Sequence, residues 1–169
     1  MLRANTRSPH DLGAKEAVSA STYTPWASTP AARLVMQGNR KRDTRPELAV
    51  RQATHALGLR YLVARRPLRG CPWTADLVFP RLRLAVFVDG CYWHGCAQHF
   101  KPPRTNAGYW GPKVERNRSR DVRVGADLRE AGWTVLRLWE HEPPTSAAER
   151  IAAAVAEARA GQARHRASL

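Results

Sequence analysis

The sequence predicts a mixed α/β fold with a small sheet, and three observations lead to this prediction. The length of 169 residues suits one domain with short tails, because domains cluster around about 100–150 residues. Hydrophobic residues make up 43% of the chain and charged residues 25%, which is close to the globular average and allows a core to form. Helical and strand-like segments follow one another as helix, three strands, helix, strand and helix. We therefore expect one domain over residues 28–160.

The first helix is predicted over residues 45–57. Thr44 is a suitable N-cap, and Pro46 lies in the first turn, where proline is tolerated. Gly58 provides the stop signal. These three residues set both ends of the helix.

The strands come in two groups. Three strand-like runs lie at residues 59–63, 74–79 and 82–88. Pro80 and Arg81 join the last two runs through a tight, hairpin-like connection. Because residues 85–88 are all apolar, we expect this strand to be central and buried. The fourth strand is expected at residues 133–139, after Gly132.

Two further helices complete the predicted domain. Residues 113–131 alternate charged residues with sparse apolar positions, which indicates a helix with one narrow buried face. Residues 146–160 are rich in Ala and predict a terminal helix. Residues 1–27, rich in Ser, Thr, Ala and Pro, are interpreted as a flexible arm, and residues 161–169 as a frayed tail.

Positive charge is the strongest indication of a binding partner. Lys and Arg number 28 against 14 Asp and Glu, a net charge of +14, and most of the excess lies in the middle of the chain. A polyanion is therefore expected, and nucleic acid fits better than a membrane because no stretch combines clustered basic residues with an apolar helical face. No apolar run reaches the ~18 residues of a membrane span, and the polar residues at the start of the sequence lack the apolar run of a secretory signal. We expect a monomeric, cytoplasmic and nucleoid-associated protein.

A metal site is predicted where Cys and His residues gather. Cys91, Cys96 and His99 are spaced as C-x4-C-x2-H, and His141 follows the last strand. Two Cys and two His are a ligand set of tetrahedral, structural zinc sites. The alternative is that the cysteines are buried thiols and the histidines surface residues. We favour zinc, because the loop is too polar and too rich in Gly and Pro to be core; Cys71 is interpreted as incidental.

Four carboxylates lie at positions where burying a negative charge costs free energy or where a helix or strand end orients it: Glu47, Asp76, Asp89 and Asp121. Asp76 lies inside a strand, and an inward-facing Asp there must be paired or bind a metal. Mg²⁺ takes oxygen ligands, with waters and phosphate oxygens filling the remaining positions, so a few carboxylates in a basic protein are typical of a phosphodiester nuclease. The alternatives are an ion pair between Asp76 and an Arg and, for Glu47, a favourable interaction with the helix dipole.

Histidine and aromatic residues in the same loop suggest further roles. His94 could take the proton of an attacking water beside a metal-bound Asp; alternatively it replaces His99 as a zinc ligand or is an ordinary loop residue. Tyr92 and Trp93 could wedge between bases and unstack them, and Met36 suggests the same role more weakly. The alternative for these aromatic residues is that they cover the small sheet.

Together these residues resemble the very-short-patch repair (Vsr) family of mismatch endonucleases. The matching segments keep their order and spacing from about residue 36 to residue 142. They comprise residues 36, 42–48, 76–79 and 86–96, parts of 101–121, and parts of 132–140. The resemblance implies a restriction-endonuclease-like mixed sheet flanked by helices. It also implies an enzyme that nicks one DNA strand on the 5′ side of the thymine in a T·G mismatch, such as arises when 5-methylcytosine deaminates.

The resemblance implies roles for individual residues. Asp76 matches a residue that binds Mg²⁺, helped by the backbone carbonyl at Val88. Glu47 and Asp121 match residues that serve the metal site through water or hydrogen bonds, and His94 matches one that assists the attacking water. Residues that intercalate beside the mismatch match Tyr92, Trp93 and Met36. The zinc ligands match Cys91, Cys96, His99 and His141. The basic residues expected to contact phosphates are Arg42, Lys101, Arg104 and Lys113.

The sequence also departs from the family pattern. Asp89 stands where the best-known members have His, so either a carboxylate adds a metal contact there or that function is lost. Ala75 replaces a common Pro, Tyr92 replaces Phe, and the last zinc ligand, often Cys, is His141. Two rival functions remain: a nuclease of the same fold that acts on matched DNA, and a zinc-stabilised DNA-binding module without catalysis. Through the family, mismatch repair proteins are further candidate partners.

Overall fold

Four strands form a mixed sheet in the order β1-β2-β3-β4. The computed structural model describes residues 42–102 and 107–168, all within a unit that spans residues 37–169. The strands are β1 (Leu62–Arg65), β2 (Ala75–Phe79), β3 (Leu84–Asp89) and β4 (Thr134–Trp139). β2 is antiparallel to both β1 and β3, whereas β3 and β4 are parallel. The small mixed sheet agrees with the prediction, and β3 is a buried inner strand as expected.

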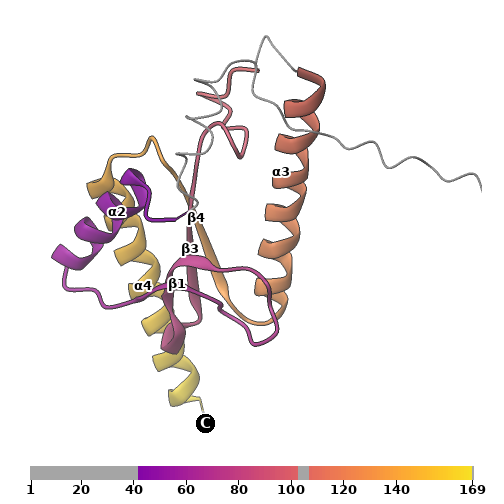
Figure 1. Ribbon diagram of the computed structural model, residues 1–169. Helices are drawn as coiled ribbons and strands as arrows, with labels where there is room; N and C mark the ends of the chain where they lie inside the picture. The colour runs from indigo at the N-terminus through magenta and orange to yellow at the C-terminus, as the bar shows by residue number, and fades with distance from the viewer. Residues whose placement is uncertain (1–41, 103–106, 169) are drawn as a thin grey trace, which may run out of the picture. The chain divides into compact units, whose positions relative to one another are not determined.

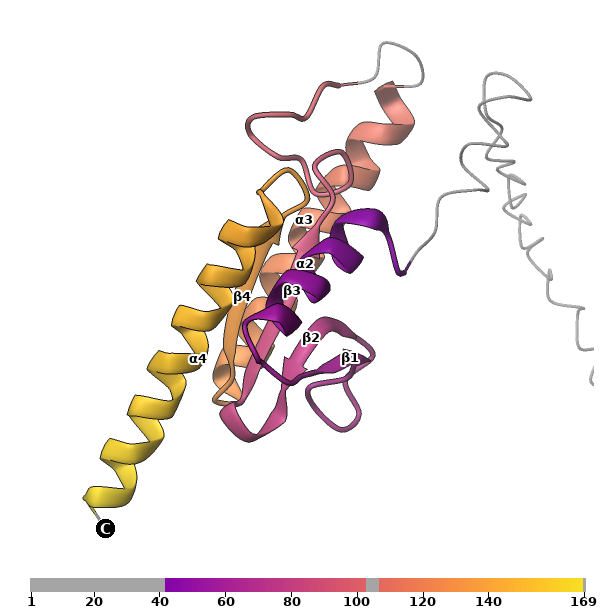
Figure 2. The same ribbon diagram turned by 90° about the vertical axis from the view of Figure 1, so that its left-hand side faces the viewer.

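Helices cover both faces of this sheet (Figures 1 and 2). They are α2 (Arg45–Ala56), α3 (Ala107–Glu130) and α4 (Pro144–Ala167). On one face, apolar residues of α2 and α4 pack against the sheet through Val50, Leu77, Phe79, Leu84, Val86, Leu138, Ala147, Ile151 and Val155. On the other face, α3 packs through Val124 and Leu128 against Ala75, Val78, Ala85, Phe87 and Trp133. The domain is therefore a three-layer sandwich.

The parallel pair β3 and β4 decides where a site can form. Because the two strands run in the same direction, their carboxyl ends lie at the same edge of the sheet. Their pairing extends to Asp89 opposite Trp139, and Glu140 then donates its N–H to the carbonyl of Asp89 at 2.9 Å. The loop that follows β3 and the turn that follows β4 consequently start side by side.

The predicted boundaries hold where local signals are strong. Thr44 caps α2, and Gly58 follows the helix with a positive φ of 76° that favours glycine. The predicted strand at 59–63 instead lies at Leu62–Arg65, because Tyr61 turns inward, donates its hydroxyl to the carbonyl of Arg51 at 2.7 Å and packs against Phe79.

Two helices are longer than predicted. α3 begins at Ala107 and contains Pro112, whereas the prediction started after this proline. α4 begins at Pro144 and continues to Ala167, so most of the segment predicted as a frayed tail, 161–169, is helical. Its Ala, Arg and Gln residues are good helix formers, and the single Gly161 does not outweigh them.

Some predictions concern residues outside the ranges that the structure describes. The arm at 1–27, Met36 and Arg104 lie outside the described residues. Within the described ranges, none of the helices combines the length and the apolar character that a membrane span needs.

Candidate active site

A cleft of about 1030 Å³ opens where β3 and β4 end. Its walls come from the start of α2, the start of β2, the end of β3 and the middle of α3. The structure brings together in this cleft all of the residues predicted to be catalytic: Glu47, Asp76, Asp89, His94 and Asp121. Val88 and Trp93 also line it.

Asp76 lies at the point where β2 and β3 separate. Paired residues of the two strands run from Phe79 opposite Leu84 to Leu77 opposite Val86. At the next step, the Oδ2 of Asp76 accepts the N–H of Val88 at 2.8 Å. A side chain has thus replaced the main-chain pairing, and the carboxylate is fixed at the cleft.

The environment of Asp76 is costly for a negative charge. Burial raises the pKa of Asp76 to about 6, and the charges of Glu47 and Asp89 add to the increase, whereas the Val88 hydrogen bond and Arg51 oppose it. Among the described residues, no basic side chain forms an ion pair with Asp76 within 4.0 Å. The alternative in which an Arg pairs with this Asp is therefore not found there.

Glu47 has a local structural role in α2. Its Oε1 accepts the hydroxyl of Thr44 at 2.9 Å, and its Oε2 accepts the N–H of Asp43 at 2.9 Å and the Nη2 of Arg51 at 3.0 Å. In return, the N–H of Glu47 donates to the Oγ1 of Thr44 at 3.5 Å, so the two residues form a variant of the capping box in which Glu47 accepts the N–H of Asp43. The carboxylate therefore closes the start of α2 and also lines the cleft.

His94 and Asp121 form a hydrogen-bonded pair across the cleft. The Nδ1 of His94 contacts the Oδ2 of Asp121, which lies on α3. Burial would raise the pKa of Asp121, but the hydrogen bond with His94 and the charges of His94, Arg137 and Arg120 lower it overall. Asp121 is consequently ionised near neutral pH and holds one nitrogen of the imidazole.

Asp89 is engaged by an arginine that sequence analysis missed. Arg137 on β4 donates from Nε to Oδ2 of Asp89 at 2.6 Å and from Nη2 to Oδ1 at 2.7 Å. Its Nη2 also lies 3.2 Å from the Oδ1 of Asp121. The signal in the sequence was a charged residue inside an otherwise apolar strand. Asp89 therefore holds a guanidinium group.

The predicted zinc ligands, three from the loop after β3 and one from the turn after β4, meet beside the cleft. The ligand atoms of Cys91, Cys96, His99 and His141 all lie within 4.8 Å of one another. Three of the sulfur to Nδ1 distances are 3.8–3.9 Å, and the Cys91–His141 distance is 3.0 Å. Zinc–sulfur and zinc–nitrogen bonds in a tetrahedron separate such atoms by roughly 3.6 Å. The donor set and its spacing fit zinc.

Backbone contacts hold this Cys/His cluster in place. Cys91 donates its N–H to the Oε1 of Glu140 at 2.6 Å, which ties the loop after β3 to the turn after β4. Cys96 donates its N–H to the carbonyl of Cys91 at 2.9 Å, and Gly95 takes the positive φ of 63° that the turn needs. Burial and the neighbouring Cys96 raise the pKa of the Cys91 thiol to about 11.

The loop aromatics pack against α3. Tyr92 and Trp93 contact the ring of Trp110 at centroid distances of 5.7 Å, and the Nζ of Lys113 lies 5.4 Å from the Trp93 ring and 5.2 Å from the Trp110 ring. The Nδ2 of Asn117 donates to the carbonyl of Trp93 at 2.9 Å. Tyr92 and Trp93 are half-buried, so the rings cover part of the fold and also reach its surface.

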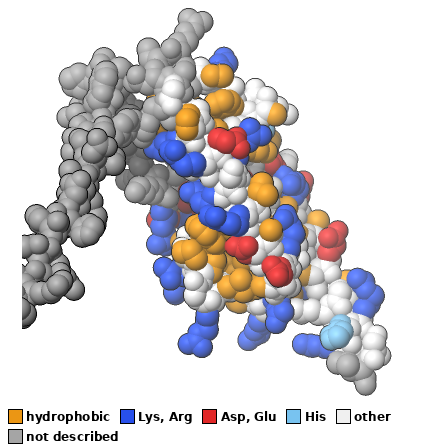
Figure 3. Space-filling view, turned by 90° about the vertical axis from the view of Figure 1, so that its right-hand side faces the viewer, with side chains coloured by type: hydrophobic (Ala, Val, Ile, Leu, Met, Phe, Trp, Pro, Cys, Tyr) orange, Lys and Arg blue, Asp and Glu red, His pale blue; other side chains and the backbone are white. Residues whose placement is uncertain are grey.

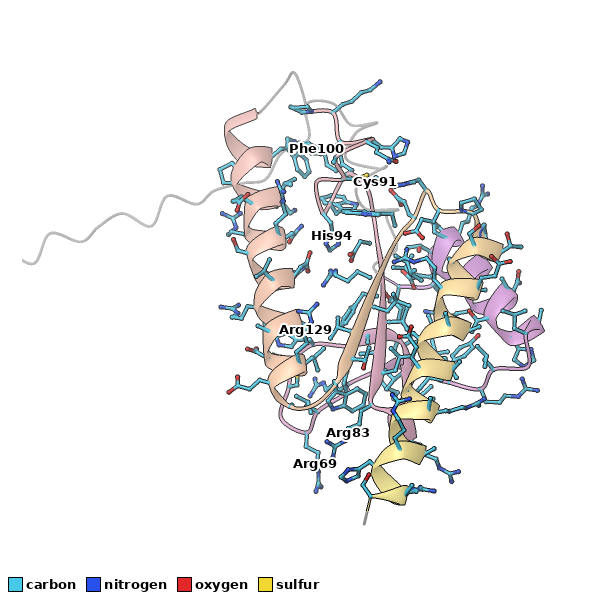
Figure 4. All side chains as sticks on the ribbon, turned by 180° about the vertical axis from the view of Figure 1, so that it is seen from behind. Arg69, Arg83, Cys91, His94, Phe100 and Arg129 are labelled. Atoms are coloured by element: carbon cyan, nitrogen blue, oxygen red, sulfur yellow. The ribbon has the colours of Figure 1, made fainter. Side chains whose placement is uncertain are left out.

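The wider surface is basic. Figure 4 shows Cys91, His94 and Phe100 at one end of the sheet and Arg69 and Arg83 at the other. Figure 3 shows Lys and Arg side chains spread over the face formed by α3, whose sequence contains more basic than acidic residues. Two residues predicted to contact phosphates, Arg42 and Lys101, are exposed.

Comparisons with known proteins identify relatives of this chain. The family model described as DNA mismatch endonuclease Vsr matches residues 27–99. The Type II nicking enzyme V.NaeI of Lentzea aerocolonigenes is 48% identical over 109 residues, which are 63% of this chain and 66% of that enzyme. The Type II nicking enzyme V.XorIIP of Xanthomonas oryzae pv. oryzae is 44% identical over 65% of this chain and 79% of the relative. The DNA mismatch endonuclease Vsr of Escherichia coli is 36% identical over 59% of this chain and 62% of that enzyme. The chain thus spans just under two thirds of V.NaeI.

Proposed function

The chain belongs to the DNA mismatch endonuclease Vsr family, and from this premise we propose that it nicks one strand of duplex DNA on the 5′ side of the thymine in a T·G mismatch. The cleft is the observation that carries the proposal. It combines Asp76, which has no basic partner among the described residues, with the His94–Asp121 pair on a chain of net charge +14. Basic surface and few carboxylates suit a phosphodiester substrate.

Asp76 and the backbone carbonyl of Val88 are the groups that would hold Mg²⁺. The fit is supported by the donor chemistry, because a buried carboxylate whose pKa is raised to about 6 gains from a divalent cation and because Mg²⁺ needs few protein ligands. When bound, Mg²⁺ neutralises charge that develops on the phosphate and on the leaving oxygen. Glu47 lines the same cleft and would support the site through water.

His94 acts as the general base in this proposal. Because Asp121 accepts from Nδ1, the favoured tautomer leaves the lone pair on Nε2, which can take a proton from the attacking water. The ionised Asp121 then stabilises the imidazolium that forms. In-line attack on phosphorus displaces the 3′ oxygen and leaves a 3′-hydroxyl and a 5′-phosphate.

Mismatch preference would come from the energy of unstacking. A wobble pair is easier to unstack than a Watson–Crick pair, so aromatic wedges cost less there. Tyr92 and Trp93 are the proposed wedges, with Met36 as a third. The partial exposure of both aromatics and the position of Trp93 in the cleft wall support this role.

The Cys/His cluster is proposed to be structural. Cys91, Cys96, His99 and His141 would hold zinc with all four tetrahedral positions, which leaves no open position for chemistry. Zinc at this place would stabilise the loop that carries His94 and the two aromatic residues. The positions proposed to contact phosphates are Arg42, Lys101, Arg104 and Lys113.

A second target is favoured by a specific observation. Two of the relatives described above are named Type II nicking enzymes, with identities of 48% and 44%, against 36% for the mismatch endonuclease. Nicking at a defined, matched sequence is therefore the alternative function. A zinc-stabilised DNA-binding module without catalysis is the third.

One nicking assay separates the three functions. The same end-labelled duplex is prepared with T·G and with T·A at one position and incubated with the protein in Mg²⁺ or in EDTA. We expect Mg²⁺-dependent nicking of the T·G duplex alone, and loss of nicking in the Asp76→Ala variant. Equal nicking of the T·A duplex would favour the matched-site enzyme, and binding without nicking would favour the module. Nicking that survives Asp76→Ala would contradict the assigned centre.

A further inference from the structure

Arg137 lies inside the proposed active site although its position on β4 predicts an apolar side chain. It pairs with Phe87 in the parallel register of β3 and β4, and its guanidinium carbon lies 5.1 Å from the centre of the Phe87 ring. The side chain lines the cleft and is 27% exposed. Because the backbone of Arg137 is paired with β3 and its guanidinium lies beside the Phe87 ring, the guanidinium has little freedom to move.

The guanidinium connects two carboxylates. Asp89 accepts two parallel bonds from Nε and Nη2, at 2.6 and 2.7 Å, and this fork geometry is the most specific that Arg and a carboxylate form. The same Nη2 lies 3.2 Å from the Oδ1 of Asp121. The other oxygen of Asp121, Oδ2, contacts His94. Asp121 is therefore held at both oxygens, by Arg137 on one side and by His94 on the other.

Pairing with Arg137 also makes Asp89 a weaker acceptor for His94. The Nδ1 of His94 lies 3.7 Å from the Oδ1 of Asp89, so a small rotation of the ring would exchange Asp121 for Asp89. Because Arg137 contacts both oxygens of Asp89, the bond to Asp121 is the better one for His94. The orientation of the imidazole thus depends on a residue that does not contact it.

We infer that Arg137 is a positioning residue which, clamped by Asp89, fixes Asp121 and thereby aims the free nitrogen of His94 into the cleft. This inference rests on the proposed nuclease function. It gives Asp89 the role of a clamp for the guanidinium instead of a metal ligand. A positioning residue acts on the rate of the chemical step, whereas a residue that holds a phosphate acts mainly on DNA affinity.

Single-turnover nicking and DNA affinity, measured for Arg137→Met, test the inference. We expect the rate to fall by roughly 10²-fold, as for a misplaced catalytic group, with the affinity for duplex unchanged. Arg137→Lys should be slow as well, because an ammonium cannot hold both carboxylates as a fork does. Arg129→Ala is the matched control, since this exposed arginine lies at the far end of α3 from His94 (Figure 4) and should nick normally.

Two further measurements exclude a merely structural role. Millimolar guanidinium, far below denaturing concentrations, should restore part of the rate of Arg137→Ala but none of the rate of Asp121→Asn. The double variant Arg137→Met/Asp121→Asn should nick no more slowly than Asp121→Asn alone, because both substitutions remove the same function, the orientation of His94. Circular dichroism and thermal melting verify the fold. If Arg137→Met does not fold, Asp89→Asn provides the same test, because it removes the clamp and keeps the arginine.

The outcomes separate this inference from the proposed function. A wild-type rate for a folded Arg137→Met variant, or a loss confined to DNA affinity, would overturn the positioning role while the nuclease function stands. A wild-type protein that nicks none of the duplexes would instead overturn the nuclease function.

Discussion

The Cys/His cluster and the acidic cleft share one loop but satisfy their polar groups in opposite ways. In the cluster, the four donors of Cys91, Cys96, His99 and His141 are directed at one another. In the cleft, most carboxylates already have cationic partners from the protein: Glu47 has Arg51, and Asp89 and Asp121 share Arg137. Asp76 alone of the four predicted carboxylates forms no ion pair among the described residues.

This difference indicates what each region contributes. A closed set of soft and borderline donors gains stability from a bound ion and offers no position to a substrate. A buried carboxylate without a cation lowers the stability of the fold and is retained where function needs it. Substituting a metal-binding side chain should therefore lower the stability of the fold in the Cys/His cluster and raise it in the cleft.

The largest effect is expected on catalysis. Asp76→Asn keeps the shape of the side chain but removes the charge proposed to hold Mg²⁺, so the single-turnover nicking rate should fall by about 10³-fold or more, equivalent to about 4 kcal/mol. Added Mg²⁺ should raise the melting temperature of the wild type slightly and leave that of the variant unchanged. Asp127→Asn, an exposed carboxylate of α3, is the control and should nick normally. Retention of most activity in Asp76→Asn would remove the distinction drawn between the two regions.

The Cys/His cluster should show the largest effect on stability. Cys96→Ser removes one of four ligands, and because the binding energy of structural zinc is of order 10 kcal/mol, we expect the free energy of unfolding to fall by several kcal/mol. Metal analysis measures the loss of bound zinc, and thermal melting measures the loss of stability. Cys71→Ser is the matched control, since Cys71 lies outside the cluster. A strong chelator that left the melting temperature of the wild type unchanged would mean that the cluster is a set of ordinary thiols and histidines.

Much of the fold could be predicted because its signals are local. Thr44, Pro46 and Gly58 mark the ends of α2 within a few residues of one another in the chain. The all-apolar run of β3 indicates an inner strand by itself. The start of β1, the start of α3 and the end of α4 differ from the predictions. Tertiary contacts of Tyr61 and of Trp110 act at the first two. In α4 the run of good helix formers outweighs the single Gly161.

The site could be predicted as a set of residues but not as a set of pairings. The spacing of Cys91, Cys96 and His99 places them in one loop, where only their mutual orientation remained open. The partner of Asp89, by contrast, depends on the register that brings β4 beside β3, and no local pattern encodes that register. Arg137 was missed for this reason, and with it the role of Asp89.

A smaller effect, of opposite sign to that at the cluster, is expected for Asp76 on stability. In the folded protein the pKa of Asp76 is raised from 3.8 to about 6, so its neutral form is favoured. The stability that this group contributes is fully present below the pKa of the unfolded chain and is lost as the pH rises through about 6. In Mg²⁺-free buffer that leaves zinc bound, Asp76→Asn should therefore raise the free energy of unfolding by up to roughly 3 kcal/mol at pH 8 and by about half as much at pH 5.

Urea unfolding of the wild type and the Asn variant at the two pH values provides the measurement. Asp127→Asn is again the control, since an exposed carboxylate should give no such difference between the two pH values. A loss of stability at pH 8 would mean that the charge of Asp76 is compensated in the folded protein. The cleft would then resemble the Cys/His cluster in being satisfied by its own fold.

The smallest effect concerns the surface around both regions. Lys101 is exposed just after the Cys/His loop, and if it contacts a phosphate, Lys101→Ala should weaken binding of matched and mismatched duplexes equally. The slope of the logarithm of affinity against the logarithm of salt concentration should become shallower by about 1, which fluorescence anisotropy between low and moderate salt can measure. Arg164→Ala, in the last turn of α4, serves as the control and should leave the slope unchanged. An unaltered slope in Lys101→Ala would mean that this lysine does not contact DNA. If the substitution instead changed the ratio of the affinities for the T·G and T·A duplexes, recognition of the mismatch would extend from the cleft to the Cys/His loop.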